Sequence, residues 1–184
     1  MNANMIEALN KIEAQNDSAS AFIAQAIDRA KEKEMSERAQ RLIINCAIAI
    51  NNADFEVSPS IAKRNVYAIE KVTKAIKALQ SESIAALDKY TVAIVQNMLK
   101  RTKNKNISNK EQNASLCVAI ECDTLSATAT RLHKASSTAD TQSSSTRHAL
   151  EALNIAIYDR NAKELRFADT EIAKRFAELF KSKK

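Results

Sequence analysis

The chain of 184 residues contains no glycine and only one proline. Average usage would supply on the order of a dozen glycines in a chain of this length. Glycine is the residue that most readily adopts positive φ, which tight β-hairpin turns and many helix C-termini require. Its absence disfavours antiparallel sheets and leaves asparagine as the expected left-handed cap residue, with Asn51, Asn52, Asn104 and Asn106 as candidates. The sequence therefore predicts an all-α protein with no sheet.

Apolar residues recur at helical spacing along most of the chain. The clearest stripe follows a predicted N-cap at Ser36 and comprises Ala39, Leu42, Ile43, Cys46, Ala47 and Ile50. Further stripes predict helices over residues 4–34 (one bent helix or two short ones), 58–76, 84–98, 108–132, 150–157 and 161–180. We expect six to eight helices joined by short connectors, which favours antiparallel neighbours in a multi-helix bundle or helical array. Residues 1–184 are predicted to form a single domain.

One compositional shift interrupts this pattern. Between positions 124 and 146, 12 of the 23 residues are Ser or Thr. The centre of the stretch, residues 135–145, is predicted to be a long loop. Because it contains neither glycine nor proline, a helix with a Ser/Thr face is the alternative.

The positive charge is concentrated in the second half of the chain. The formal net charge is +6, with 13 basic against 12 acidic residues in 1–100 and 15 against 10 in 101–184. Much of the excess lies in a predicted basic connector, residues 100–110, whose five cations are Lys100, Arg101, Lys103, Lys105 and Lys110. Five cations without an intervening acid can neutralise nucleic-acid phosphates, but no aromatic residue is interleaved to stack on bases. The alternative is a solvated loop whose lysines favour the C-terminal dipole of the preceding helix.

The C-terminal segment combines basic residues with Phe176, Leu179 and Phe180. Such an amphipathic end can dock into the groove of a partner or lie on an anionic membrane surface. The alternative interpretation is that these side chains close the protein's own core.

The residues that commonly carry chemistry do not form a recognisable motif. Without glycine there is no Walker A loop, dinucleotide fingerprint or Gly-flanked nucleophile elbow. Neither His133 nor His148 has an acidic residue three positions before it, as di-iron helical bundles require, and Cys117 and Cys122 are too far apart around a helix to hold one zinc ion. We therefore expect no enzyme activity, catalytic residue, metal or cofactor.

An odd number of cysteines, three, and an N-terminus without a basic and apolar leader favour a reducing compartment. The longest apolar stretch, 42–50, is too short to span a membrane. We expect a cytoplasmic protein, or one that is intracellular or virion-associated.

The function predicted from the sequence is that of a non-enzymatic structural or protein-interaction protein, which binds a protein partner or itself. A subunit of a larger assembly, such as a phage or viral particle, and an inhibitor of another macromolecule both fit. The alternative is a basic helical protein that binds DNA or RNA through phosphate contacts.

Overall fold

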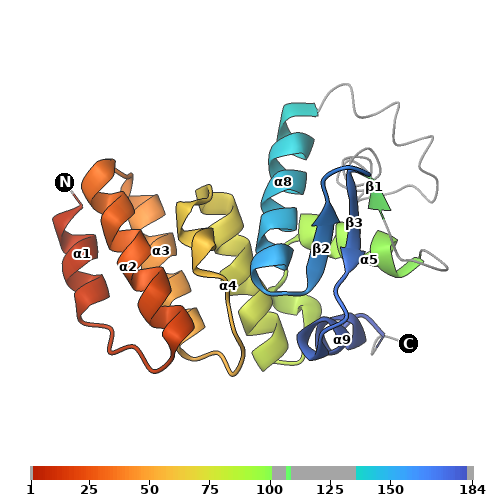
Figure 1. Cartoon of the computed structure of the whole chain (residues 1–184), viewed down its shortest axis with the longest axis horizontal. Coiled ribbons are helices and arrows are strands. Elements are labelled where there is room, and N and C mark those ends of the chain that lie inside the picture. The colour runs from red at the N-terminus through yellow and green to blue at the C-terminus, as the bar shows by residue number, and fades with distance from the viewer. Residues whose placement is uncertain (1, 101–106, 109–135, 182–184) are drawn as a thin grey trace.

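The computed structural model describes residues 2–100, 107–108 and 136–181. In these residues the chain is mostly helical and elongated (Figure 1). The α-helices are α1 (Ala3–Asn10), α2 (Asp17–Glu32), α3 (Glu37–Asn51), α4 (Val66–Gln80), α5 (Lys89–Lys100), α8 (Ser136–Ala152) and α9 (Glu171–Glu178). Two 3₁₀ helices, η1 (Pro59–Lys63) and η2 (Ile84–Ala86), and three strands, β1 (Ile107–Ser108), β2 (Ala156–Asp159) and β3 (Glu164–Phe167), complete the described elements.

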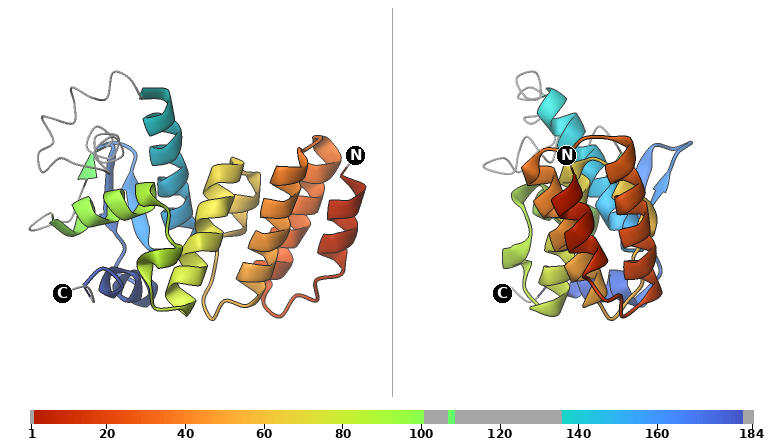
Figure 2. Two further views of the ribbon diagram at one scale, coloured as in Figure 1. Left: turned by 180° about the vertical axis from the view of Figure 1, so that it is seen from behind. Right: turned by 90° about the vertical axis from the view of Figure 1, so that its left-hand side faces the viewer.

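Helices α1 to α4 stand side by side as an array, and α8 packs on α4 at its end (Figures 1 and 2). The prediction of antiparallel neighbours is wrong for α3 and α4, which run parallel. Arg38 and Glu70, near the two N-termini, approach to 3.4 Å, and at the other end Gln80 Nε2 donates to the carbonyl of Asn52 at 3.0 Å. The reason is the long connection 52–65, which returns along α2 through η1 before α4 begins.

Side-chain caps explain where the helices of the array begin. Asn16, Ser36 and Asn65 precede α2, α3 and α4, and the side-chain oxygen of each accepts from the backbone N–H three residues later. This satisfies an N–H that the helix itself leaves without a partner. The cap predicted at Ser36 is confirmed, whereas Pro59 opens the 3₁₀ helix η1 rather than an α-helix.

The asparagine side chain at the end of α3 forms hydrogen bonds to a neighbouring segment. The side chain of Asn51 accepts from the N–H of Gln15 at 2.7 Å and donates to the carbonyl of Glu13 at 3.0 Å. The left-handed positions in the described residues are instead Glu82, Asn154 and Lys163, with φ of 50°, 53° and 55°. Asn52 is the C-cap residue of α3, but with φ of −95° it is not left-handed, and Asn51 is the last residue of the helix. The prediction of a left-handed cap is therefore wrong for both, while Asn104 and Asn106 lie outside the described residues.

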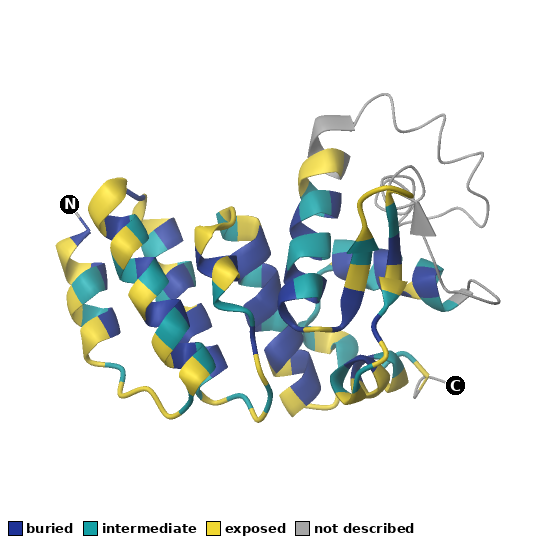
Figure 3. Ribbon diagram, in the orientation of Figure 1, coloured by how far each residue is buried: buried dark blue, intermediate teal, exposed yellow. Residues whose placement is uncertain are grey.

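The core is a continuous cluster that extends from α1 through the array to α9 (Figure 3). Small and β-branched side chains fill much of it, as the composition predicts, and Cys46 is buried among them. The largest fully buried side chains include Phe22 in α2 and Phe176 in α9. Because every helix buries a narrow stripe, many helices share one core.

The prediction of no sheet is wrong. The three strands form an antiparallel sheet in the order β1-β3-β2, with Tyr158 opposite Leu165 and Ile107 also opposite Leu165. Burial alternates along β2 and β3, which is the period of a strand with one covered face. The helices predicted over 150–157 and from 161 therefore end earlier and begin later, at Ala152 and Glu171.

The loop predicted at 135–145 is also wrong for residues 136–145, which belong to α8; residue 135 lies outside the described residues. The hydroxyl of Ser145 lies 2.6 Å from the carbonyl of Thr141 and 3.1 Å from Asn65 Oδ1 at the start of α4. Ser143, Ser145 and Thr146 are buried. Hydroxyls that bond back to the helix and to a neighbour let a Ser/Thr-rich segment pack as a helix.

Candidate nucleic-acid interface

Helix α8 and the β2–β3 hairpin form one module at the end of the array. The helix contacts α4, α5 and β2, and the hairpin lies beside it (Figure 1). Four residues of α8, Ser144, Arg147, His148 and Glu151, are partly exposed and fall on one face at helical spacing. This face carries hydroxyl, guanidinium, imidazole and carboxylate groups, all of which form hydrogen bonds.

The hairpin tip presents two cations on a short, well-defined turn. The carboxylate of Asp159 accepts from the backbone N–H groups of Asn161 and Ala162 at 2.8 and 2.9 Å, which closes the turn. These two hydrogen bonds lower the pKa of Asp159, so the carboxylate stays ionised. Arg160 and Lys163 are exposed at the tip.

Helix and hairpin are tied together by Arg147. Its guanidinium carbon lies 4.1 Å from the centroid of the Tyr158 ring in β2, a cation–π contact. Its Nε lies 4.0 Å from Glu151 Oε2 one helical turn away. Burial raises the pKa of Glu151, and three cations, those of Arg147, Arg64 and Arg160, act to lower it, together with the N–H of Tyr158.

His148 lies among these cations. Burial and the nearby guanidinium groups of Arg64 and Arg147 lower its pKa from 6.5 to about 4. The imidazole is therefore neutral at neutral pH. Arg64, between η1 and α4, acts on His148 from the array, so the cluster joins the array to the helix–hairpin module.

Two described parts of the predicted basic connector lie beside this module. Lys100 is the last residue of α5, and β1 at Ile107–Ser108 pairs with β3 of the hairpin sheet. Arg101, Lys103, Lys105 and Lys110 lie outside the described residues, so the prediction that they bind nucleic acid stays a prediction.

The prediction that the C-terminal aromatics dock a partner is wrong for Phe176. This side chain is fully buried, and its ring centroid lies 5.8 Å from that of Phe180. Leu179 and Phe180 are half-buried and pack against the core. The alternative interpretation, that these residues close the protein's own core, describes them better.

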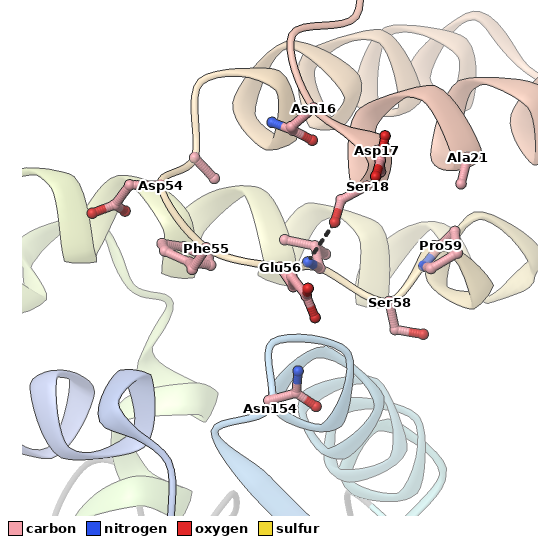
Figure 4. A pocket seen from close by; sticks show the side chains of 12 residues that line it. Asn16, Asp17, Ser18, Ala21, Asp54, Phe55, Glu56, Ser58, Pro59 and Asn154 are labelled. Atoms are coloured by element: carbon pink, nitrogen blue, oxygen red, sulfur yellow. Dashed lines mark hydrogen bonds between the residues drawn. The ribbon is translucent and has the colours of Figure 1, made fainter.

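A depression in the surface lies where the array meets the C-terminus of α8. It is an open pocket of about 740 Å³, and Figure 4 shows Asp17, Asp54 and Glu56 among its lining residues. Within the pocket, the hydroxyl oxygen of Ser18 accepts a hydrogen bond from the N–H of Val57 at 3.1 Å. Asp54 is also paired with Arg175 of α9 at 3.2 Å. Its acidic lining makes it unsuited to a nucleic-acid backbone.

A buried ion pair holds α4 against the start of α5. Lys71 Nζ lies 2.6 Å from Asp88 Oδ1, and the two side chains are 5% and 15% exposed. Asp88 also accepts from the hydroxyl and the N–H of Thr91. The pair lines a small pocket of about 180 Å³ with Arg38, Tyr67 and Tyr90. Because both charges are satisfied by each other, the pair is structural.

The described residues offer neither a metal cluster nor a membrane span. No three metal-binding side chains cluster within the part of the chain that the structure describes. None of its described helices is both long enough and apolar enough to cross a membrane.

Sequence reasoning missed the residues of this module. Residues 150–157 were assigned to a helix, although β2 begins at Ala156. Five residues were therefore not identified as candidates: Arg64, Arg147, Tyr158, Arg160 and Lys163. The alternation of Ile157 and Tyr158 with their neighbours was the available signal. Comparison with known proteins adds no further identification, since no family model, curated protein or solved structure matches the chain.

Proposed function

We propose that this protein is a non-enzymatic nucleic-acid-binding protein that works inside the cell or in a virion, and that α8 and the β2–β3 hairpin contact duplex DNA. The major groove of DNA, about 12 Å wide, admits an α-helix or a two-stranded ribbon. The module offers both, side by side.

The observation that carries this proposal is the position and chemistry of α8. Its N-terminal end stands clear of the other described elements (Figures 1 and 2). Its partly exposed face presents Ser144, Arg147 and His148. Hydroxyl and guanidinium groups are among the donors that contact phosphates and base edges, and a helix N-terminus also favours an anion.

The charge of the hairpin supports the same function. A fold alone does not assign a function, so the chemistry of the site has to support it. The exposed cations at the hairpin tip, Arg160 and Lys163, are suited to phosphate contacts.

The test is the affinity for a labelled DNA duplex, measured by fluorescence anisotropy over a series of salt concentrations. The logarithm of the binding constant should fall linearly with the logarithm of the salt concentration, with a slope of about −0.9 per neutralised phosphate. Replacing Arg160, Lys163 and Arg166 with Gln should weaken binding and make this slope shallower. The matched control replaces Lys11, Lys31 and Lys33 with Gln, which removes the same charge from the far end of the array.

Two outcomes contradict the proposal. Affinity that does not depend on salt excludes phosphate contacts as its source. If the hairpin and control variants lose affinity equally, the DNA is held by overall charge and not by the module. Tighter binding of single-stranded RNA than of duplex DNA would assign the module a different nucleic acid.

A second candidate function, docking of an anionic protein partner, is favoured by the outer face of α3 and α4. Ile48 and Tyr67 are exposed there, 45% and 39%, although both are large apolar side chains. The same two helices expose three cations, Arg38, Arg41 and Lys77, and Lys74 is half-buried beside them. An exposed aromatic residue beside arginine is typical of protein interfaces.

This second function is tested with the pair Ile48→Asp and Tyr67→Ser, followed by light scattering and by capture with an acidic partner peptide. The change should abolish self-association or peptide binding and leave DNA affinity unchanged. Unchanged association would exclude this face.

A further inference from the structure

We propose that Arg64, Arg147 and His148 form a phosphate subsite within this interface, and that a phosphate bound there causes His148 to take up a proton. The inference rests on the function proposed above, because the phosphate is that of the DNA backbone. The group that the site binds is a phosphate, and the affinity of the site for DNA depends on pH.

The cluster has more cations than its single carboxylate can neutralise. Arg64, Arg147 and Arg160 all act on Glu151, and only Arg147 is near enough for an ion pair, at 4.0 Å. With His148 neutral, the charges of three guanidinium groups therefore act on one carboxylate. The excess of positive charge favours an anion.

Hydrogen-bond donors in the cluster also lack acceptors. Arg147 Nη2 lies 3.5 Å from His148 Nε2, and an arginine can only donate. The Nε2 atom must therefore accept, which places the imidazole proton on Nδ1. In the described part of the chain, the buried atoms without a hydrogen-bond partner include His148 Nδ1 and Arg147 Nε. A buried donor without an acceptor is unfavourable, and a phosphate oxygen is an acceptor that reorientation of these side chains can reach.

The backbone that carries Arg64 is held in place. A single nitrogen of Arg29, Nη1, donates to the carbonyl groups of Ala62 and Arg64 at 2.6 and 2.7 Å. Arg64 itself is exposed. Its charge acts on both His148 and Glu151 of α8, so a phosphate bound between Arg64 and α8 would contact both parts of the molecule.

The charges around His148 explain why binding should be linked to a proton. Arg64 faces it from the start of α4, Arg147 and Glu151 from α8, Tyr158 from β2, and Arg160 from the hairpin. Burial and the first two arginines hold the pKa of His148 at about 4. A phosphate that pairs with these arginines offsets their charge, so the pKa should rise toward 6.5.

The test is an NMR titration of the imidazole of His148, with and without a short DNA duplex. The His133→Gln background leaves His148 as the only histidine of the chain. The duplex should shift the titration midpoint upward. Between pH 6.5 and 4 the affinity should also rise as the pH falls, by at most about tenfold per pH unit for one proton.

Two single variants give the matched comparison. Arg64→Gln should lose the upward shift that the duplex causes, and Lys63→Gln, which removes a neighbouring exposed cation, should keep it. Arg64→Gln also raises the midpoint in the free protein, because it removes a cation near His148. The comparison therefore uses the change in the His148 midpoint that the duplex causes in each variant. Equal shifts in the two variants would overturn the role of Arg64.

The outcomes separate this inference from the proposed function. Duplex binding with an unchanged His148 midpoint overturns the subsite and leaves the function standing. A midpoint raised by inorganic phosphate or pyrophosphate, without duplex binding, supports the subsite for a free phosphate compound and overturns the function. If the duplex does not bind, and neither it nor inorganic phosphate or pyrophosphate changes the His148 midpoint, both the subsite and the proposed function are overturned.

Discussion

Single residues decide how the described parts of this protein are joined. Lys71 and Asp88 link α4 to α5 through a buried ion pair at 2.6 Å. Burial by itself would raise the pKa of Asp88, but Lys71 and the hydrogen bonds from Thr91 outweigh it and lower the pKa. Burial lowers the pKa of Lys71, and Asp88 partly offsets this effect. Each charge is therefore tolerated because the other is present.

Removing one member of this pair should be more harmful than removing both. We expect Asp88→Ala to lower the free energy of unfolding by about 3–5 kcal/mol, because it leaves a buried ammonium group without its partner. The double variant Lys71→Met with Asp88→Ala should recover about 1–3 kcal/mol of this loss. Urea denaturation of both single variants and the double variant measures the coupling. A double variant no more stable than Asp88→Ala would show that the pair is not coupled.

The stability should also depend on pH through His148. Its pKa is about 4 in the folded protein, below the usual 6.5. Between these values the unfolded chain binds a proton that the folded protein does not, so the free energy of unfolding should fall as the pH is lowered from 6.5 toward 4. Above pH 6.5 this contribution is absent. Denaturation at several pH values should show a flatter dependence for His148→Gln than for the wild type, and parallel curves would contradict the assignment.

At the scale of elements, the β2–β3 hairpin shows why composition alone misled the prediction. The missing glycine disfavours a hairpin only if its turn needs glycine. Here Asp159 holds two N–H groups of the turn, and Lys163 takes the left-handed position with φ of 55°. The tertiary contacts of the sheet outweigh the local cost, which is about 1–2 kcal/mol for a residue with a Cβ atom.

This explanation predicts the effect of adding a glycine. Lys163→Gly should raise the free energy of unfolding by up to about 1 kcal/mol, because glycine adopts positive φ without the steric cost. Lys163→Ala is the control, since alanine keeps the cost and removes the same charge. Thermal or urea unfolding of the two variants measures the difference. If alanine stabilises the protein as much as glycine does, the effect comes from the lysine charge and not from the backbone.

Elements that are encoded within one segment of the sequence could be predicted, and elements that depend on contacts with other segments could not. The cap at Ser36 and the stripe that includes Cys46 are encoded within one helix, and both were predicted. Helix α8 was predicted only as the alternative to a loop, because its hydroxyl groups are satisfied partly from outside the helix, through Ser145 and Asn65. The parallel course of α3 and α4 depends on the path of the connection 52–65, which no periodicity reveals. The cluster around Arg147 and His148 joins α4, α8 and β2, so it arises only on folding.

At the scale of the whole molecule, the described chain consists of a helical array with a helix–hairpin module at one end (Figure 1). One core passes through both parts, from Met5 in α1 to Phe176 in α9. The proposed phosphate subsite would lie where they meet, because Arg64 comes from the array and Arg147 from the module. This division suits a protein that binds DNA with one end and leaves the other available to a partner.

Binding of duplex DNA by α8 and the hairpin can be mapped through the backbone amide NMR shifts as a duplex is added. The shifts should concentrate in α8 and in residues 156–167, and the amides of α1 and α2 should stay unchanged. Raising the salt concentration should reverse the shifts, because phosphate contacts release counterions. Shifts confined to α1–α3, or no shifts at a saturating DNA concentration, would contradict it.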